Sequence, residues 1–196
     1  GPVEVGLHSD GPVTLELVPT EPRESVGSAF VADDVVAISG GARGITAEIA
    51  VALATASSPR LVLLGRSALP GAEADWLKDL HDEASVKAAL VARASAPLKP
   101  REVQQQWRAI DAAREVRRNL ARIEDAGSEV QYHAVDVRDS DAVSRVLAGV
   151  RKEWGPITGL VHGAGVLADR TIDDKTDDDV RAVVSTKVEG LSALLA

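Results

Sequence analysis

At 196 residues, with 45% hydrophobic and 27% charged residues, the chain is long enough for one packed domain and has the composition of a globular protein. Its net charge of −8 argues against a nucleic-acid or anionic-membrane partner, and the lack of cysteine and of spaced histidines argues against disulfides and metal sites. No apolar run approaches the length of a membrane span and no signal peptide is recognisable, so we predict a cytoplasmic location.

Residues 1–30 predict N-terminal strands and a linker ahead of the main domain, which we assign to residues 31–196. Two apolar runs, Val3–Leu7 and Val13–Val18, flank a Ser-Asp-Gly-Pro turn and predict a hairpin or an edge extension. The residues that follow are rich in Pro, Glu, Ser and Gly, as in a linker. The chain contains no methionine, so we expect it to be a segment of a longer polypeptide.

A buried strand, a glycine-rich turn and a helix follow one another over residues 34–56. The strand is apolar and rich in β-branched residues, and Ile45, Ile49 and Leu53 are spaced for one face of the helix. Such a turn lets the backbone approach a pyrophosphate, and the helix N-terminus offers free N–H groups to it. Glycines also mark ordinary strand-to-helix turns, so the loop alone leaves both readings open. The candidate phosphate-binding residues are Gly40, Gly41, Arg43, Gly44 and Ile45.

A second buried strand, Leu61–Gly65, ends in Arg66 and Ser67. The tip of the second strand in a doubly wound sheet lies beside the adenosine ribose, where an acidic residue selects NAD and an arginine accommodates the 2′-phosphate of NADP. Arg66 lies about 20 residues past the glycine turn, where the residue that contacts the ribose is expected, and no acidic residue occupies the tip. We therefore predict NADPH as the cofactor; the alternative is an exposed arginine without a ligand.

Residues 68–128 are too many for a simple crossover between parallel strands and predict a helical insertion. Their pattern indicates three helices, over about 72–80, 83–94 and 101–125. The third has an apolar stripe on one face and arginines on the others. The insertion is therefore either an addition with a solvated basic face or a docking surface for an acidic partner. The arginines are Arg101, Arg108, Arg114, Arg117, Arg118 and Arg122.

Two further strands are predicted over Val130–Val135 and Ile157–Val161, joined by a helix over 141–154. Ligands of doubly wound sheets lie beyond the carboxyl ends of the strands, so the tips are candidates for a cofactor site. For His162 we favour a structural role, with the ring satisfied by the backbone. These elements together predict an α/β fold with a Rossmann-like doubly wound parallel sheet, incomplete and interrupted by the insertion. The candidate tip residues are Asp136, Val137, Gly163, Ala164 and Gly165.

A final helix is predicted to begin near Thr176 with a capping-box-like opening. Its apolar stripe, Val180, Val184, Leu191 and Leu194, has Lys187 at its middle position. A lysine on such a stripe is costly unless its ammonium reaches water or is paired. Lys187 is therefore either one of the many surface lysines without a role or a functional residue.

In this order the strand tips resemble the short-chain dehydrogenase/reductase family, and in particular the ketoreductase domains of polyketide and polyunsaturated-fatty-acid synthases. The resemblance covers about residues 34–196. It implies reduction of a β-ketoacyl group on an acyl carrier protein by NADPH. It also implies that Lys187 is catalytic, lowering the pKa of a tyrosine proton donor and holding the nicotinamide ribose. The motifs that carry it are Ser39–Gly44, Leu61–Ser67, Asp136–Val137, His162–Asp169 and Thr186–Gly190.

The chain departs from the family pattern in two places. Thr46 stands where many members have a third glycine, and the single tyrosine, Tyr132, lies in the predicted third strand rather than after a fifth. We therefore expect this chain to be the cofactor-binding half, inactive alone, with the remaining half of the domain as a partner. The alternatives are a non-catalytic pseudo-reductase domain of a synthase, against which the glycine loop and Arg66 count, and another short-chain dehydrogenase chemistry, against which Lys187 counts.

Overall fold

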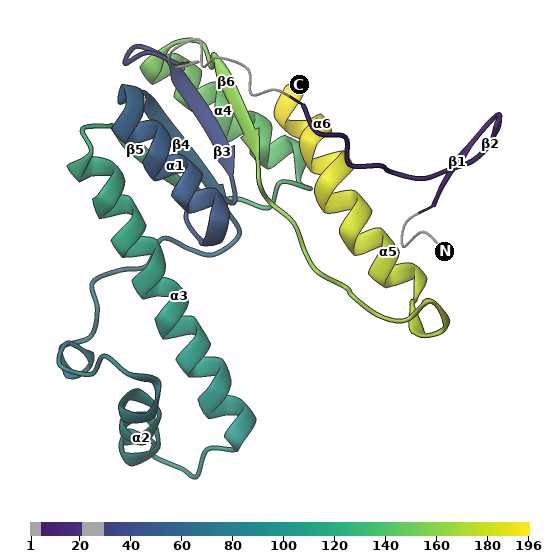
Figure 1. Cartoon of the computed structure of the whole chain (residues 1–196). Coiled ribbons are helices and arrows are strands. Elements are labelled where there is room, and N and C mark those ends of the chain that lie inside the picture. Colours follow the sequence, from purple (N-terminus) through teal and green to yellow (C-terminus); the bar gives the residue numbers. More distant parts are fainter. Residues whose placement is uncertain (1–4, 21–29) are drawn as a thin grey trace.

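The computed structural model describes residues 5–20 and 30–196. Its core is a parallel sheet of four strands in the order β5-β4-β3-β6, with helices on both faces (Figure 1). The strand order reverses between β3 and β6, which is the switch point of a doubly wound sheet. The predicted α/β fold with a Rossmann-like parallel sheet is therefore confirmed. The strands are β3 (Val35–Ser39), β4 (Arg60–Gly65), β5 (Val130–Ala134) and β6 (Gly159–His162).

Both faces of the sheet are covered because β3 and β4 point apolar side chains alternately to either side. One face packs against α1 (Gly44–Ser57) and α3 (Pro100–Asp125). The other packs against α4 (Ser140–Trp154) and α6 (Gly190–Leu195). This arrangement leaves the carboxyl ends of the strands, where the predicted site residues stand, at one open edge of the layers.

Helix α1 contacts the sheet mainly through alanines, and of the predicted stripe Ile45, Ile49 and Leu53 only Leu53 packs against the core. Ala47, Ala50 and Ala54 are fully buried, whereas Ile45 is 83% and Ile49 42% exposed. The alanines carry no atoms beyond Cβ, so the helix backbone can approach the sheet closely, and this turns the larger side chains outward. The expectation that Ile45 and Ile49 face the core is therefore wrong.

The insertion between β4 and β5 forms a helical arm with a small core of its own (Figure 1). It contains α2 (Glu83–Arg93) and the 26-residue helix α3, close to their predicted bounds. The helix predicted over 72–80 is wrong, because only a 3-10 turn, η1 (Asp75–Leu77), forms there. The buried core of the arm consists of Leu77, Val86, Leu90 and Val103.

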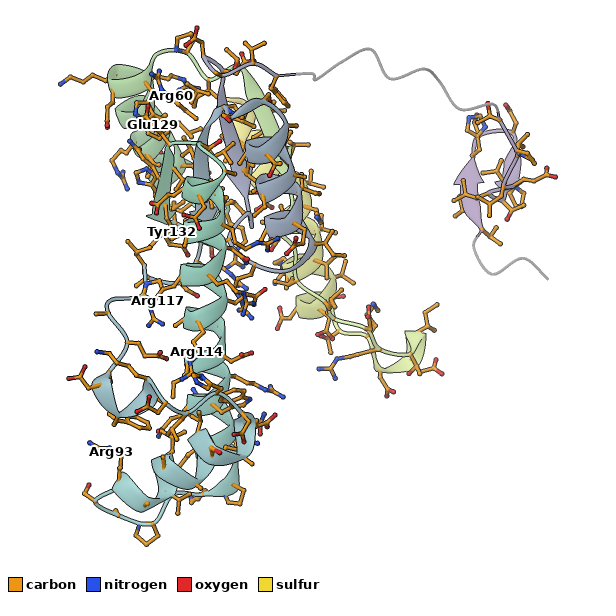
Figure 2. All side chains as sticks on the ribbon, turned by 60° about the vertical axis from the view of Figure 1, so that its left-hand side comes forward. Arg60, Arg93, Arg114, Arg117, Glu129 and Tyr132 are labelled. Atoms are coloured by element: carbon orange, nitrogen blue, oxygen red, sulfur yellow. The ribbon has the colours of Figure 1, made fainter. Side chains whose placement is uncertain are left out.

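Side chains of α3 bond to the segment before α2. The Arg114 guanidinium pairs with Glu73 (Nε–Oε1 2.6 Å) and donates to the Leu77 carbonyl (2.9 Å). Arg117 Nε donates to the Gly71 carbonyl at 2.9 Å. Figure 2 shows both arginines directed from α3 toward this segment. These two arginines thus hold the arm together. Arg122 is also paired, with Glu48, so the basic surface proposed for an acidic partner depends on Arg101, Arg108 and Arg118.

The C-terminal helical region is a single rod in three parts, α5 (Asp177–Val184), a π-helical turn η3 (Ser185–Glu189) and α6. Its start is the predicted capping box, with the Thr176 hydroxyl accepting from the Asp179 N–H at 3.2 Å. The predicted apolar stripe is wrong in its first part, because nearly half of Val180 and of Val184 is exposed, whereas Leu194 near its end is buried as expected. The other buried residues of this region are Ser185, Thr186, Gly190 and Ala193.

The N-terminal region forms a two-stranded antiparallel hairpin, β1 (Gly6–His8) and β2 (Gly11–Val13). A hairpin was predicted here, but its second strand is misplaced, because β2 begins within the predicted turn and residues 14–18 do not form a strand. Its strands are largely exposed, and the apolar residues after it are exposed as well. Most of the predicted linker falls on residues 21–29, which lie outside the described residues.

Candidate cofactor site

A cavity of about 610 Å³ lies along the carboxyl ends of the strands. It joins the tips of all four strands, as expected for the ligand crevice of a doubly wound sheet. Three predicted residues of the glycine turn, Gly41, Gly44 and Ile45, are not in its wall, and neither is Lys187. The predicted residues that line it are Gly40, Arg43, Arg66, Ser67, Asp136, Val137, Gly163, Ala164 and Gly165.

The glycines of the turn after β3 have different roles. Gly40 has a φ of 73°, and a Cβ there would lie 3.0 Å from the backbone nitrogen of Ala164, so this position needs glycine on both counts. Gly41 instead packs on the sheet, where a Cβ would lie 2.7 Å from Ile38 Cγ2. Gly44 opens α1 with a φ of 60°. The turn therefore brings two strand tips close together and presents the start of α1 to the cavity.

The start of α1 has free hydrogen-bond donors beside the cavity. Within the described residues, the backbone N–H groups of Ile45 and Thr46 have no protein acceptor. These are two of the unpaired N–H groups that every α-helix leaves at its N-terminus, and they suit an anion such as a phosphate. The exposed Ile45 side chain contributes nothing to this, so only its backbone can act in the predicted role.

The third donor at this helix end is already paired, with a residue that the sequence analysis missed. The Gly44 N–H donates to Glu115 Oε1 of α3 at 2.8 Å, and Arg43 Nε donates to Oε2 of the same carboxylate at 2.8 Å. Burial raises the pKa of the Glu115 carboxyl, but the bonds from Gly44 and Arg43 outweigh it and leave that pKa below its ordinary value. The carboxylate is therefore ionised at neutral pH.

Two more contacts fix α3 beside the glycine turn. The buried Asn119 side chain donates to the Ala42 carbonyl at 3.0 Å. One turn further along, Arg122 makes a bidentate pair with Glu48 of α1, at 2.6 and 2.8 Å. In the sequence, the signal for this docking was a polar residue, Asn119, among the apolar positions Val116 and Ile123 of the helix.

At the end of the cavity beside β4 and β5, the tip of β4 is held by Tyr132. Its hydroxyl donates to the Ser67 carbonyl at 2.8 Å, and burial raises the pKa of the phenol. A Cβ at Gly65 would lie 2.6 Å from the same hydroxyl oxygen. Tyr132 lies in β5, as predicted, and Figure 2 shows it at the end of the sheet that faces the arm. Tyr132 is therefore a structural residue, while Arg66 beside it is exposed and free to meet a ligand.

Asp136 follows β5 as a fixed negative charge. Arg138 clamps its carboxylate with Nη2–Oδ2 and Nε–Oδ1 distances of 2.6 and 3.0 Å. The side-chain bonds from Arg138 lower the pKa of Asp136 to about 2. The next residue, Val137, is buried and contributes an apolar surface to the cavity.

At the other end of the cavity His162 links β3, β6 and η3. Its Nε2 lies 3.1 Å from the Thr186 carbonyl and its Nδ1 lies 2.7 Å from Ser39 Oγ. Because a carbonyl can only accept, we assign the tautomer with the proton on Nε2, which leaves Nδ1 to accept from Ser39. Ser39 Oγ in turn accepts from the Ala164 N–H at 3.2 Å. This agrees with the structural role favoured for His162, with one of its two partners a hydroxyl rather than the backbone.

The same network places Lys187 next to the end of the cavity. Lys187 is exposed and lies in the π turn, directly after Thr186. Its Cε and Nζ atoms lie 3.2 and 3.4 Å from where a Cβ on Gly165 would be, so its side chain passes over the tip of β6. Single π turns are found frequently at functional sites. The structure thus brings Lys187 to the cavity although it is not part of the wall.

Comparison with known proteins identifies the family. A family model described as KR domain matches residues 35–196. The chain belongs to the KR domain family. It is similar to a polyunsaturated fatty acid synthase subunit from Thraustochytrium sp., with 34% identity over 191 residues, 92% of this chain and 7% of that protein.

Solved structures share the fold of this KR domain. An N-terminal ketoreductase from a macrolactin assembly line matches 88% of this chain and 26% of its own, with a TM-score of 0.59 and 22% identity. A metagenomic short-chain oxidoreductase in complex with NADP matches 84% of this chain and 54% of its own, with a TM-score of 0.55 and 22% identity. The short-chain dehydrogenase fold predicted from the sequence is confirmed, and this chain spans at most about half the length of these relatives.

The described part of the chain has groups that suit an anion, namely the free N–H groups of α1 and the arginines of the cavity wall, and it has the Lys187 ammonium beside the tip of β6. Within residues 5–20 and 30–196 no cluster of three or more carboxylates and histidines suits a metal ion. No helix in that part of the chain is long and apolar enough to span a bilayer. The one tyrosine is already bonded to Ser67, away from Lys187. What the arrangement can do is bind a dinucleotide across the strand tips and place a cation at one end of it.

Proposed function

We propose that this chain is the cofactor-binding part of an NADPH-dependent ketoreductase. Its substrate would be a β-ketoacyl group on an acyl carrier protein, and the product the β-hydroxyacyl group, within a polyketide or polyunsaturated-fatty-acid synthase. The observation that carries the proposal is the single cavity joining all four strand tips, with Arg43 and Arg66 toward one end and Lys187 at the other. The similarity to a polyunsaturated fatty acid synthase protein supports the synthase context.

The residues present fit such a cofactor. Gly40 lines the cavity, and the free N–H groups of Ile45 and Thr46 would bind the pyrophosphate. Arg66 would take the 2′-phosphate through charge-assisted hydrogen bonds, which an unphosphorylated cofactor cannot form. When bound, NADPH would supply a hydride for the ketone carbon. The remaining roles would fall to Asp136 and Val137 at the adenine and to Lys187 at the nicotinamide ribose.

Reduction of a ketone also needs a proton for the carbonyl oxygen. A proton donor must lie within hydrogen-bond reach of that oxygen, and Tyr132 is committed to Ser67 in a strand. Lys187 would remain a cation and lower the pKa of a separate acid rather than donate the proton itself. We propose that this acid belongs to a further part of the polypeptide, which acts as the partner of the residues described here.

Cofactor titration tests the binding part of this proposal. We expect the chain to bind NADPH more tightly than NADH, and Arg66→Ala to weaken NADPH binding about tenfold while NADH is unaffected. Arg60→Ala is the matched control, because Arg60 is at the opposite end of β4 and pairs with exposed Glu129 at 3.4 Å (Figure 2). Equal affinity of the unchanged chain for the two cofactors would contradict the proposal, as would an equal effect of both substitutions.

Turnover tests the catalytic part. NADPH oxidation with a β-keto thioester should be absent for this chain alone and should appear when the rest of the domain is supplied. The restored activity should be lost in Lys187→Met, which removes the cation but keeps an unbranched side chain. Robust turnover by this chain alone would show that the assignment of the proton donor is wrong.

A further inference from the structure

The insertion delivers a negative charge to the end of the cavity where the two nicotinamide cofactors differ. Glu115 lies on α3, 71 residues after Gly44 in the sequence, and its carboxylate bonds to the Gly44 N–H and to Arg43. Its neighbours on α3, Ala112 and Val116, line the cavity together with Arg43, Arg66 and Ser67. The Glu115 side chain is 24% exposed, so its charge is only partly screened by water.

The carboxylate occupies groups that an incoming phosphate would also use. A helix N-terminus and a guanidinium are the two commonest ways to hold a phosphate, and Glu115 saturates one donor of each kind. NADPH and NADH share the pyrophosphate and differ only in the 2′-phosphate, a dianion that meets the Arg43 and Arg66 end of the cavity. A carboxylate fixed there repels this group, while the neutral 2′-hydroxyl of NADH does not feel the charge.

We propose that Glu115 determines cofactor specificity by competing with the 2′-phosphate for Arg43, and so limits the preference of this site for NADPH over NADH. The inference rests on the proposed function, because it assumes that the cavity binds a nicotinamide dinucleotide. It gives the helical insertion a role in the cofactor site, in addition to a possible role as a docking surface for an acidic partner.

The contacts of α3 hold the backbone of Glu115 beside the glycine turn. Asn119, one turn along the same face, bonds the buried carbonyl of Ala42 inside the glycine turn. Arg122 continues the same row with its bidentate pair to Glu48. Moving Glu115 away from the turn would therefore require breaking the docking of α3 on α1, so the competition is decided at Arg43 and not by movement of the helix.

Isosteric substitution separates the charge from the packing. Glu115→Gln keeps an oxygen that can accept from Gly44 but removes the charge and releases Arg43. We expect it to tighten NADPH binding about fivefold at low salt and to leave NADH within about twofold. Glu48→Gln is the matched control, since it neutralises the other carboxylate between α1 and α3 away from the cavity, and it should change neither affinity. Adding Arg43→Gln to the Glu115→Gln variant should remove the gain.

Isothermal titration of NADPH and NADH into these three variants and the unchanged chain decides the question. An unchanged ratio of the two affinities in Glu115→Gln, or a gain that is equal for NADH, would overturn the inference while leaving the proposed function intact. The same holds if Glu48→Gln shifts the ratio as much. If no variant binds either cofactor, the proposed function fails and the inference fails with it. Thermal unfolding of Glu115→Gln shows that the variant is folded, and 2′,5′-ADP titrated against 5′-AMP repeats the test on the adenosine end alone.

Discussion

Gly163 and Thr46 meet where β6 ends and α1 begins, and this contact fixes how closely the two elements approach. A methyl group on Gly163 would collide with Thr46 Oγ1 and Cγ2 and would lie 2.8 Å from its Cβ. The φ angle of Gly163 is not among the positive ones, so alanine could adopt the backbone conformation. The substitution Gly163→Ala therefore tests the contact and not the flexibility of glycine.

The expected cost follows from how little either residue can move. Overpacking a close-packed site costs about 1 to 3 kcal/mol. The Gly163 N–H is bonded to the Ser39 carbonyl at 3.0 Å and Thr46 is in the first turn of α1, so we expect about 2 to 3 kcal/mol here. Thr46→Gly removes all three colliding atoms at a helix-propensity cost of up to about 1 kcal/mol. In that background Gly163→Ala should add almost nothing, which gives a coupling energy of about 2 kcal/mol.

Urea unfolding of the unchanged chain, the two single variants and the double variant measures this coupling. Gly149→Ala is the control for the glycine-to-alanine change itself, because nothing lies within 4 Å of a methyl group there in α4. It should stabilise the protein slightly, by up to about 1 kcal/mol. If Gly163→Ala costs the same with Thr46 and with glycine at position 46, the reasoning is refuted and Thr46 does not set the spacing.

Three further substitutions test single contacts by urea unfolding. Asn119→Ala leaves the Ala42 carbonyl without a donor and should cost about 2 kcal/mol; less than about 0.5 would contradict its role. His162→Ala removes the bridge between β3 and η3 and should cost about 1 to 3 kcal/mol, and no loss of stability would argue against the assigned bonds. Asp136→Asn should cost about 1 kcal/mol at pH 7, allowing for partial exposure. The folded pKa of Asp136, about 2, is below its ordinary value of 3.8, so this stability is present above about pH 4 and is lost as the pH falls toward 2; a difference from the unchanged chain that is constant with pH would refute it.

The sequence predicted those parts of the fold that depend on local pattern. Continuous apolar runs become the strands β3 and β4 because both faces of the sheet are covered. The order of strand tips places nine of the thirteen predicted site residues along one cavity, because parallel strands end at the same edge. The structural role of His162 also followed from its place at a strand end.

What the sequence could not predict depends on contacts between distant segments. The bond from Gly44 to Glu115 joins residues 71 positions apart, and nothing local to either residue marks it. The helix predicted over 72–80 also lies in a segment that contacts a distant one, since Arg114 of α3 bonds to the Leu77 carbonyl and Arg117 to the carbonyl of Gly71 just before it. For α1, the large side chains were predicted to face the sheet, whereas the buried residues are alanines. Alanine is common on every face of a helix, so the sequence did not mark them as the contact.

The apolar stripe predicted for the last helix does not hold over its whole length because a π turn interrupts the helix, and Lys187 lies in this turn. A period of 3.6 residues per turn puts each residue about 100° around the axis from the one before, and a stripe can be drawn only while that period holds. The π turn Ser185–Glu189 accommodates an extra residue, so residues after it are rotated relative to those before it. Leu194 is consequently buried while Val180 and Val184, on the same drawn stripe, are half exposed. The bond from His162 to the Thr186 carbonyl is made inside this turn, and Lys187, the next residue of the same turn, lies over Gly165.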